Sequence, residues 1–212
     1  MISTLAIVST SDLDSYDFDA LNRLSAGFWA NTSKRLFYVY SYMKQFGKTN
    51  CIHLENDYLI YFDGAVLLGR TKLLLTMDRE DERARCIPGF LFIPYASYMQ
   101  VLVETYDHAT NDMVNMARFY FDHPATCEAL NIVPSRSTSS VMLFDAAAIG
   151  QYLGGIDPNN NGGVIQPGYV SPDCMVDYSV YSFRWIREAS GMHVPSVRVG
   201  GIDVKIHGLH IH

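Results

Sequence analysis

Two carboxylates interrupt an apolar stretch in the segment IHLENDYLIY, residues 52–61. Glu55 and Asp57 follow a predicted strand, and apolar residues resume at Tyr58. Carboxylate oxygens at this spacing can converge on one hard cation such as Mn²⁺ or Mg²⁺. The alternative is an ordinary turn, because Asn and Asp favour turns. The apolar flanks favour the metal site, since two close carboxylates with reduced hydration need a compensating cation or an Arg.

A second candidate group lies at the end of the chain, which reads HGLHIH. His210 and His212 would project from the same face of a terminal strand, because side chains alternate along a strand. A neutral imidazole can complete a carboxylate metal site. The alternative is an ordinary polar terminus. The spacing does not decide which of the two histidines would bind the metal.

Three more polar residues are candidates for the same site. Arg35 lies near the start of the predicted helix that precedes the acidic turn, where a planar guanidinium could bind a phosphate or a carboxylate. The commoner role for such a residue is a solvated cation. Asp112 lies at the start of another predicted helix, where capping is the simplest role. Asp145 follows the apolar pair Leu143-Phe144, and its sequence position fits either a structural or a catalytic role.

The segments that would position these residues are predicted strands and helices that alternate along the chain. Short apolar runs predict strands at 5–8, 51–54, 58–61, 72–77, 89–93, 197–199 and 204–212. Helical spacing predicts helices at 34–45, 97–107, 112–121 and the later part of 142–152, and a long loop at 153–173. Thr32-Ser33 is a predicted helix N-cap and Gly47 a predicted C-cap.

This alternation predicts an α/β fold in one domain, residues 1–212, with a mixed, mostly parallel central sheet flanked by helices. In such sheets ligands bind beyond the carboxyl ends of the strands. Two polar clusters follow strands in that way. They are Ser9, Thr10, Ser11 and Asp12 after the first strand, and Glu55, Asn56 and Asp57 after the second.

Composition narrows the possible partners. The chain has 212 residues, 49% of them hydrophobic, and a net charge of −6. The acidic balance argues against nucleic acid as a partner, because nonspecific binding needs a basic face. No apolar run reaches the roughly 20 residues that span a bilayer. Four scattered cysteines without a CxxC pair suggest reduced thiols, so we expect a cytoplasmic protein without a membrane span.

The ordered set of these motifs resembles nucleotide-sugar glycosyltransferases of the GT-A type, which have a Rossmann-like fold. The segment SKRLFYVYSYMKQFGKTNCIHLENDYLIY resembles their Arg-bearing helix, hydrophobic strand and DxD motif, with Glu55 in place of the first Asp. The pieces GFLFI, TNDMVNMARFY and FDAAAIGQYLGGID, and the ending LHIH, extend the resemblance over nearly the whole chain. The likeness is strongest to a viral subgroup that glycosylates capsid proteins, which implies the host cytoplasm.

The resemblance implies roles for the residues at matching positions. Glu55, Asp57 and either His210 or His212 would bind Mn²⁺ or Mg²⁺. Arg35 would contact the diphosphate or the sugar of a UDP-sugar donor, and Asp112 would lie near the sugar. Asn56 and Asp57 would also belong to the residues that bind the donor. Ser9, Thr10, Ser11 and Asp12 would hold the nucleoside. Two departures, Ile87-Pro88 before Gly89 and Thr110-Asn111 before Asp112, leave the donor sugar open.

The resemblance thus implies transfer of a hexose, glucose or a related 6-deoxyhexose, from a UDP-sugar to a hydroxyl of a glycan or glycoprotein acceptor. We expect retention of the anomeric configuration, because similar enzymes with a metal and a histidine often retain it. An inverting enzyme would need a general base, for which Asp112 and Asp145 are the candidates. Two alternatives stay open, a non-catalytic nucleotide-sugar or glycan-binding module and another metal-dependent phosphoester or nucleotidyl enzyme. Chains of that family continue past this strand, which would make the 212 residues a domain of a longer protein.

Overall fold

The computed structural model describes residues 28–77, 85–132, 142–147, 182–199 and 201–211, and all statements below concern these residues. In chain order the elements are α2 (Phe28–Gln45), β1 (Cys51–Leu54), β2 (Tyr58–Ile60), the 3₁₀ turn η2 (Gly64–Leu67), β3 (Leu73–Met77), β4 (Cys86–Ile93), α3 (Ala96–Glu104), α4 (Asp112–Asp122), β5 (Cys127–Ala129), β6 (Leu143–Phe144), β7 (Ser182–Arg187), β8 (His193–Val199) and β9 (Ile202–His210).

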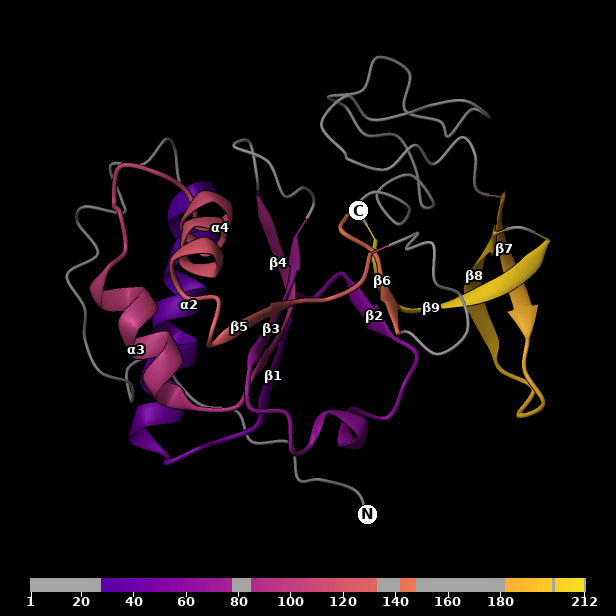
Figure 1. The fold of residues 1–212 in the computed structure, drawn as a ribbon, viewed down its shortest axis with the longest axis horizontal. Coiled ribbons are helices and arrows are strands. Elements are labelled where there is room, and N and C mark those ends of the chain that lie inside the picture. The colour runs from indigo at the N-terminus through magenta and orange to yellow at the C-terminus, as the bar shows by residue number, and fades with distance from the viewer. Residues whose placement is uncertain (1–27, 78–84, 133–141, 148–181, 200, 212) are drawn as a thin grey trace.

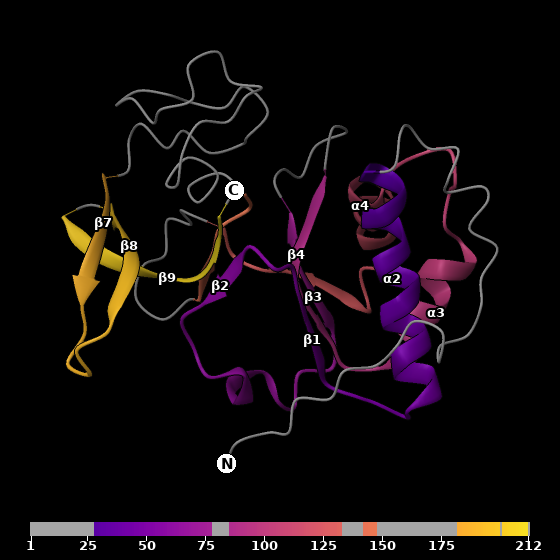
Figure 2. The ribbon, with the colours of Figure 1, turned by 180° about the vertical axis from the view of Figure 1, so that it is seen from behind.

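A first sheet, in the order β1-β4-β3-β5, forms the centre of the molecule. The three helices α2, α3 and α4 cover one of its faces, and β2 and β6 approach from the other side (Figures 1 and 2). Strand β4 pairs antiparallel with both β1 and β3, and β3 pairs parallel with β5. The chain therefore has a layer of helices, a mixed sheet, and further strands behind that sheet.

A second sheet, in the order β2-β9-β8-β7, lies on the side of the first sheet that faces away from the helices. Strand β9 holds it together, because its start pairs with β8 and its end pairs with β2. The two-residue strand β6 pairs parallel with the later part of β9. The end of β9, and with it His210, is thereby brought to the boundary between the two sheets.

The α/β class predicted from the sequence is confirmed, but the prediction of a mostly parallel sheet is wrong for the described strands. Antiparallel pairs outnumber parallel ones in both sheets. The reason is connection length, since a parallel neighbour needs a crossover of about a dozen residues or more. Only eight residues separate Met77 of β3 from Cys86 of β4, which suffices for a hairpin. The parallel pair β3–β5 forms only after the chain has crossed over through α3 and α4.

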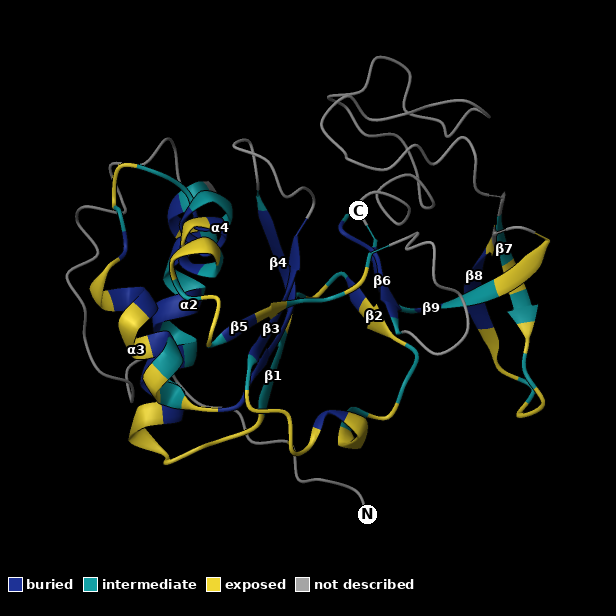
Figure 3. Ribbon diagram, viewed as in Figure 1, coloured by how far each residue is buried: buried dark blue, intermediate teal, exposed yellow. Residues whose placement is uncertain are grey.

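Both faces of the first sheet are buried, as Figure 3 shows for β3 and β4. Leu73, Leu75 and Met77 of β3 face the helices and pack in the larger core. Leu74 points the opposite way, into a cluster with Phe90, Phe92, Phe144 and Tyr58. Central strands covered on both faces carry continuous apolar runs, which explains KLLLTM and GFLFI.

The start of α2 differs from the prediction. The helix begins at Phe28, so Thr32 and Ser33 lie inside it and do not cap it. Their hydroxyls instead contact polar groups of other elements. The predicted C-cap at Gly47 is confirmed. Gly47 has a φ of 58°, and the Lys48 N–H donates to the Met43 carbonyl oxygen at 2.9 Å.

Several predicted elements lie outside the described residues. They are the strand at 5–8, most of the helical stretch within 142–152, and the loop at 153–173. Where the structure does describe the start of that stretch, it has the strand β6. Among the described helices none is long and apolar enough to span a membrane.

Candidate metal centre

The acidic turn carries the chain from the first sheet to the second. The Glu55 N–H donates to the Gly89 carbonyl oxygen at 3.0 Å, which extends the β1–β4 ladder by one residue. The Asp57 carbonyl oxygen accepts from the Ile211 N–H at 2.8 Å, which extends the β2–β9 ladder. The backbone of Glu55 thus pairs with the first sheet and the backbone of Asp57 with the second, so both carboxylates lie at the junction of the two sheets.

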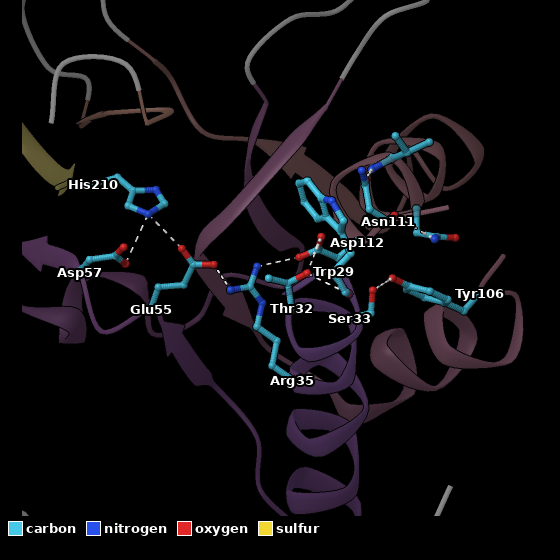
Figure 4. Close-up of polar contacts among 12 residues, drawn as sticks. Trp29, Thr32, Ser33, Arg35, Glu55, Asp57, Tyr106, Asn111, Asp112 and His210 are labelled. Carbon is cyan, nitrogen blue, oxygen red and sulfur yellow. Dashed lines mark hydrogen bonds and ion pairs between the residues drawn. The ribbon is translucent and has the colours of Figure 1, made fainter. Parts of the chain in front are cut away.

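His210 reaches the same junction from the end of β9. Its cross-strand partner is Tyr58, directly after the acidic turn. The residue is 4% exposed, and its Nε2 lies 2.9 Å from Glu55 Oε2 and 3.4 Å from Asp57 Oδ1 (Figure 4). One potential ligand atom from each of the three residues lies within 4.8 Å of the others. The structure therefore brings together Glu55, Asp57 and His210; His212 lies outside the described residues.

Burial determines the charge of this group. Desolvation lowers the pKa of His210 below its usual value, and it outweighs the opposing effect of Asp57 and Asp145. The imidazole is then neutral at pH 7 and has one ring proton, so it cannot balance two carboxylates. Asp57 Oδ1 is itself buried, at 3.4 Å from His210 Nε2. Two carboxylates and a neutral imidazole fit a divalent cation such as Mn²⁺.

Arg35 lies beside this group and connects it to the helices (Figure 4). Its Nη1 donates to Glu55 Oε1, and its Nη2 donates to Asp112 Oδ2 at 2.7 Å. Asp112 is 1% exposed and begins α4, whereas the cap of that helix is the preceding Asn111, which accepts from the Val114 N–H. A continuous chain of contacts runs from α4 through Arg35 to the three candidate ligands.

The imidazole of His210 lies in a narrow space between Gly89 and Tyr58. A Cβ at position 89 would come within 2.8 Å of His210 Nδ1 and 2.9 Å of Tyr58 Cδ2. The Tyr58 ring packs on the imidazole with centroids 5.5 Å apart. Glycine at position 89 is therefore what lets the histidine approach β4 closely.

Replacing Gly89 with alanine is expected to displace His210 and Tyr58. We expect the free energy of unfolding to fall by about 1–3 kcal/mol, as for other overpacked sites, together with a loss of Mn²⁺ affinity. Urea unfolding and Mn²⁺ titration of the same variant measure the two effects. Gly64→Ala is the matched control, because a Cβ there meets only the flexible tip of Ile52 at 2.9 Å. Equal Mn²⁺ affinity in both variants would contradict the proposed role of Gly89.

His53 gives a pH dependence that can be measured separately. Burial, and to a smaller extent the charge of Arg35, lower the pKa of His53 to about 4. Between pH 6.5 and 4 the unfolded chain therefore binds a proton that the folded chain does not, and stability falls on acidification. The expected contribution of this residue is up to about 3 kcal/mol. Urea unfolding at pH 6.5 and pH 4 should show a smaller difference in the free energy of unfolding in His53→Phe than in the original chain. An equal difference in both proteins would contradict the lowered pKa of His53.

The other predicted site residues lie as follows. Asp145 is fully buried after β6, its N–H donates to the Gly208 carbonyl oxygen at 2.8 Å, and its charge acts on both His210 and Tyr58. Asn56 is exposed in the turn and is not one of the three grouped residues. Ser9, Thr10, Ser11 and Asp12 lie outside the described residues.

Sequence reasoning missed three residues around this group, namely Thr32, Tyr58 and Gly89. A glycine inside an apolar strand often marks a close approach of another group, so Gly89 carried a readable signal. Thr32 carried none, because a Thr before a helical pattern favours a cap.

Comparison of the chain with protein-family models, with curated proteins and with solved structures found no match.

Proposed function

We propose that this protein is a metal-dependent glycosyltransferase that moves a hexose from a UDP-sugar to a hydroxyl of a glycan or glycoprotein acceptor. The observation that carries the proposal is the convergence of Glu55, Asp57 and His210 at the junction of two sheets. Arg35 lies beside them, and its ion pairs with Glu55 and Asp112 hold the guanidinium next to the group. A diphosphate is the kind of ligand that a divalent cation and an arginine bind together.

The chemistry that follows is stabilisation of a leaving group. Glu55, Asp57 and His210 would hold Mn²⁺ or Mg²⁺, which supplies Lewis acidity toward the diphosphate when bound. Arg35 would face the same diphosphate, where negative charge grows as the glycosidic bond breaks. His210 serves as a ligand because burial favours its neutral form. Asn56, exposed in the turn, is available to the part of the donor nearest the solvent.

The same proposal includes the fold class, the stereochemistry, the biological role and the nucleoside-binding residues. We assign the chain to the GT-A class, as a single domain, because an acidic turn leaves a sheet that helices cover on one face. Within that class we propose a retaining enzyme that acts in capsid glycoprotein synthesis in the cytoplasm of a host cell. Ser9, Thr10, Ser11 and Asp12 would contact the nucleoside. These assignments rest on the resemblance of the sequence motifs.

The experiment that tests the function is a thermal-shift screen of nucleoside diphosphates with and without Mn²⁺, followed by an assay of product release. We expect UDP to raise the melting temperature only when Mn²⁺ is present, and UDP to be released from one UDP-sugar. Binding without release under any acceptor would instead indicate a nucleotide-sugar-binding module. Release of inorganic phosphate or pyrophosphate would indicate a different metal-dependent enzyme.

A further inference from the structure

The orientation of Arg35 requires more than its contact with Glu55. An arginine side chain has many rotamers, and its guanidinium becomes a precise ligand only when its own surroundings fix it. Arg35 is 21% exposed at its side chain, so packing alone does not hold it. Its second contact, Nη2 to Asp112 Oδ2 at 2.7 Å, is with a residue that is almost fully buried.

Asp112 is well suited to hold a cation in place. It occupies the first turn of α4, where the aligned peptide dipoles favour a negative charge. Its Oδ2 accepts from Arg35, and its Oδ1 lies 3.2 Å from the hydroxyl of Thr32. Both oxygens are therefore engaged, and the side chain is 1% exposed. This arrangement suits a carboxylate that positions a neighbour better than one that takes a proton from an acceptor.

Thr32 completes the contact from the helix that also carries Arg35. The two residues are three positions apart in α2, so their side chains lie on the same face of the helix. The Thr32 hydroxyl is within hydrogen-bond distance of the Trp29 carbonyl oxygen, at 3.0 Å, and of Asp112 Oδ1. The hydroxyl has one proton, and the carboxylate is the stronger of the two acceptors.

We infer that Thr32 and Asp112 are positioning residues that fix the guanidinium of Arg35 beside Glu55. Thr32 orients the carboxylate of Asp112, and Asp112 orients Arg35 (Figure 4). That Arg35 then faces a diphosphate rests on the proposed function. The orientation of Arg35 itself does not, and it can be measured without any assay of activity.

The test compares three variants of the full chain. Thr32→Val removes the hydroxyl at nearly constant shape, and Thr32→Ser keeps it. Ser33→Ala is the matched control, because Ser33 lies in the same helix and its buried hydroxyl accepts from Tyr106 at 2.6 Å, a contact that includes neither Arg35 nor Asp112. The readout is the rate of rotation about the Nε–Cζ bond of Arg35, measured by NMR on ¹⁵N-arginine-labelled protein, with the signal assigned by its loss in Arg35→Lys.

We expect slow rotation in the original chain, in Thr32→Ser and in Ser33→Ala, and rotation about tenfold faster in Thr32→Val, as for one lost hydrogen bond to a charged group. Unchanged rotation in Thr32→Val, or an equal increase in Ser33→Ala, would overturn the inference. If rotation changes as expected but no UDP-sugar is turned over, the positioning role stands and the proposed function fails. Where turnover exists, kcat/KM for the donor should fall in Thr32→Val and recover in Thr32→Ser.

Discussion

Asp57→Asn is expected to lower the affinity for Mn²⁺ by at least about 100-fold, because losing a direct ligand should exceed the losses seen for outer-shell residues. Asp57 is the least buried of the three candidate ligands, with 37% of its side chain exposed. The substitution keeps the shape of the side chain and should leave the fold intact. The Mn²⁺-dependent rise in melting temperature with UDP should disappear with it. Isothermal titration with Mn²⁺ alone measures the first effect, and thermal shift the second.

The matched control is Asp122→Asn, an exposed aspartate at the end of α4 and outside the grouped residues. It changes the net charge of the chain by the same amount, so it reports any general electrostatic effect. An equal fall in Mn²⁺ affinity in both variants would show that Asp57 acts only through net charge.

Arg35→Ala is expected to lower the free energy of unfolding by about 3 kcal/mol, because removing one partner of a buried ion pair leaves a buried charge unpaired. The unpaired charge here is Asp112, at 1% exposure. Arg35 is partly exposed, which keeps the expected loss at the lower end for such pairs. Urea unfolding at pH 7 measures the effect.

The double variant Arg35→Ala/Asp112→Asn distinguishes an ion pair from simple loss of packing. Removing the Asp112 charge as well should recover most of the lost stability. A double variant as unstable as the sum of the two single ones would mean that Arg35 and Asp112 do not depend on each other. The stabilities of the original chain, of Arg35→Ala, of Asp112→Asn and of the double variant together measure the coupling of the pair directly.

Local features of the fold were predictable from the sequence, and strand pairing was not. The strands at 51–54, 58–61, 72–77 and 89–93 are present because short apolar runs between turn residues identify buried strands. The same runs do not say which strand pairs with which. The prediction of a mostly parallel sheet was wrong because β3 pairs antiparallel with β4. The hydrophobic periodicity of a strand does not show the direction in which it pairs with its neighbour.

The candidate site shows the same division. Glu55, Asp57 and Arg35 were identifiable because their residue types and the neighbouring strand suggested a charged junction. The position of His210 in the group depends on the register of β9 on β2, which places it opposite Tyr58, whereas His212 lies outside the described residues. The role of Thr32 required the start of α2, since the same residue at a helix end would have been a cap. Tertiary contacts, and not local preference, determine both.

We propose that Glu55, Asp57 and His210 bind one divalent cation. The most direct test is pulsed electron paramagnetic resonance of Mn²⁺ bound to the protein, which detects nitrogen ligands through their nuclear modulation. We predict one bound Mn²⁺ per chain with the modulation of a single imidazole nitrogen, lost in His210→Ala. Bound Mn²⁺ without that modulation, or with a modulation unchanged in His210→Ala, would contradict the claim.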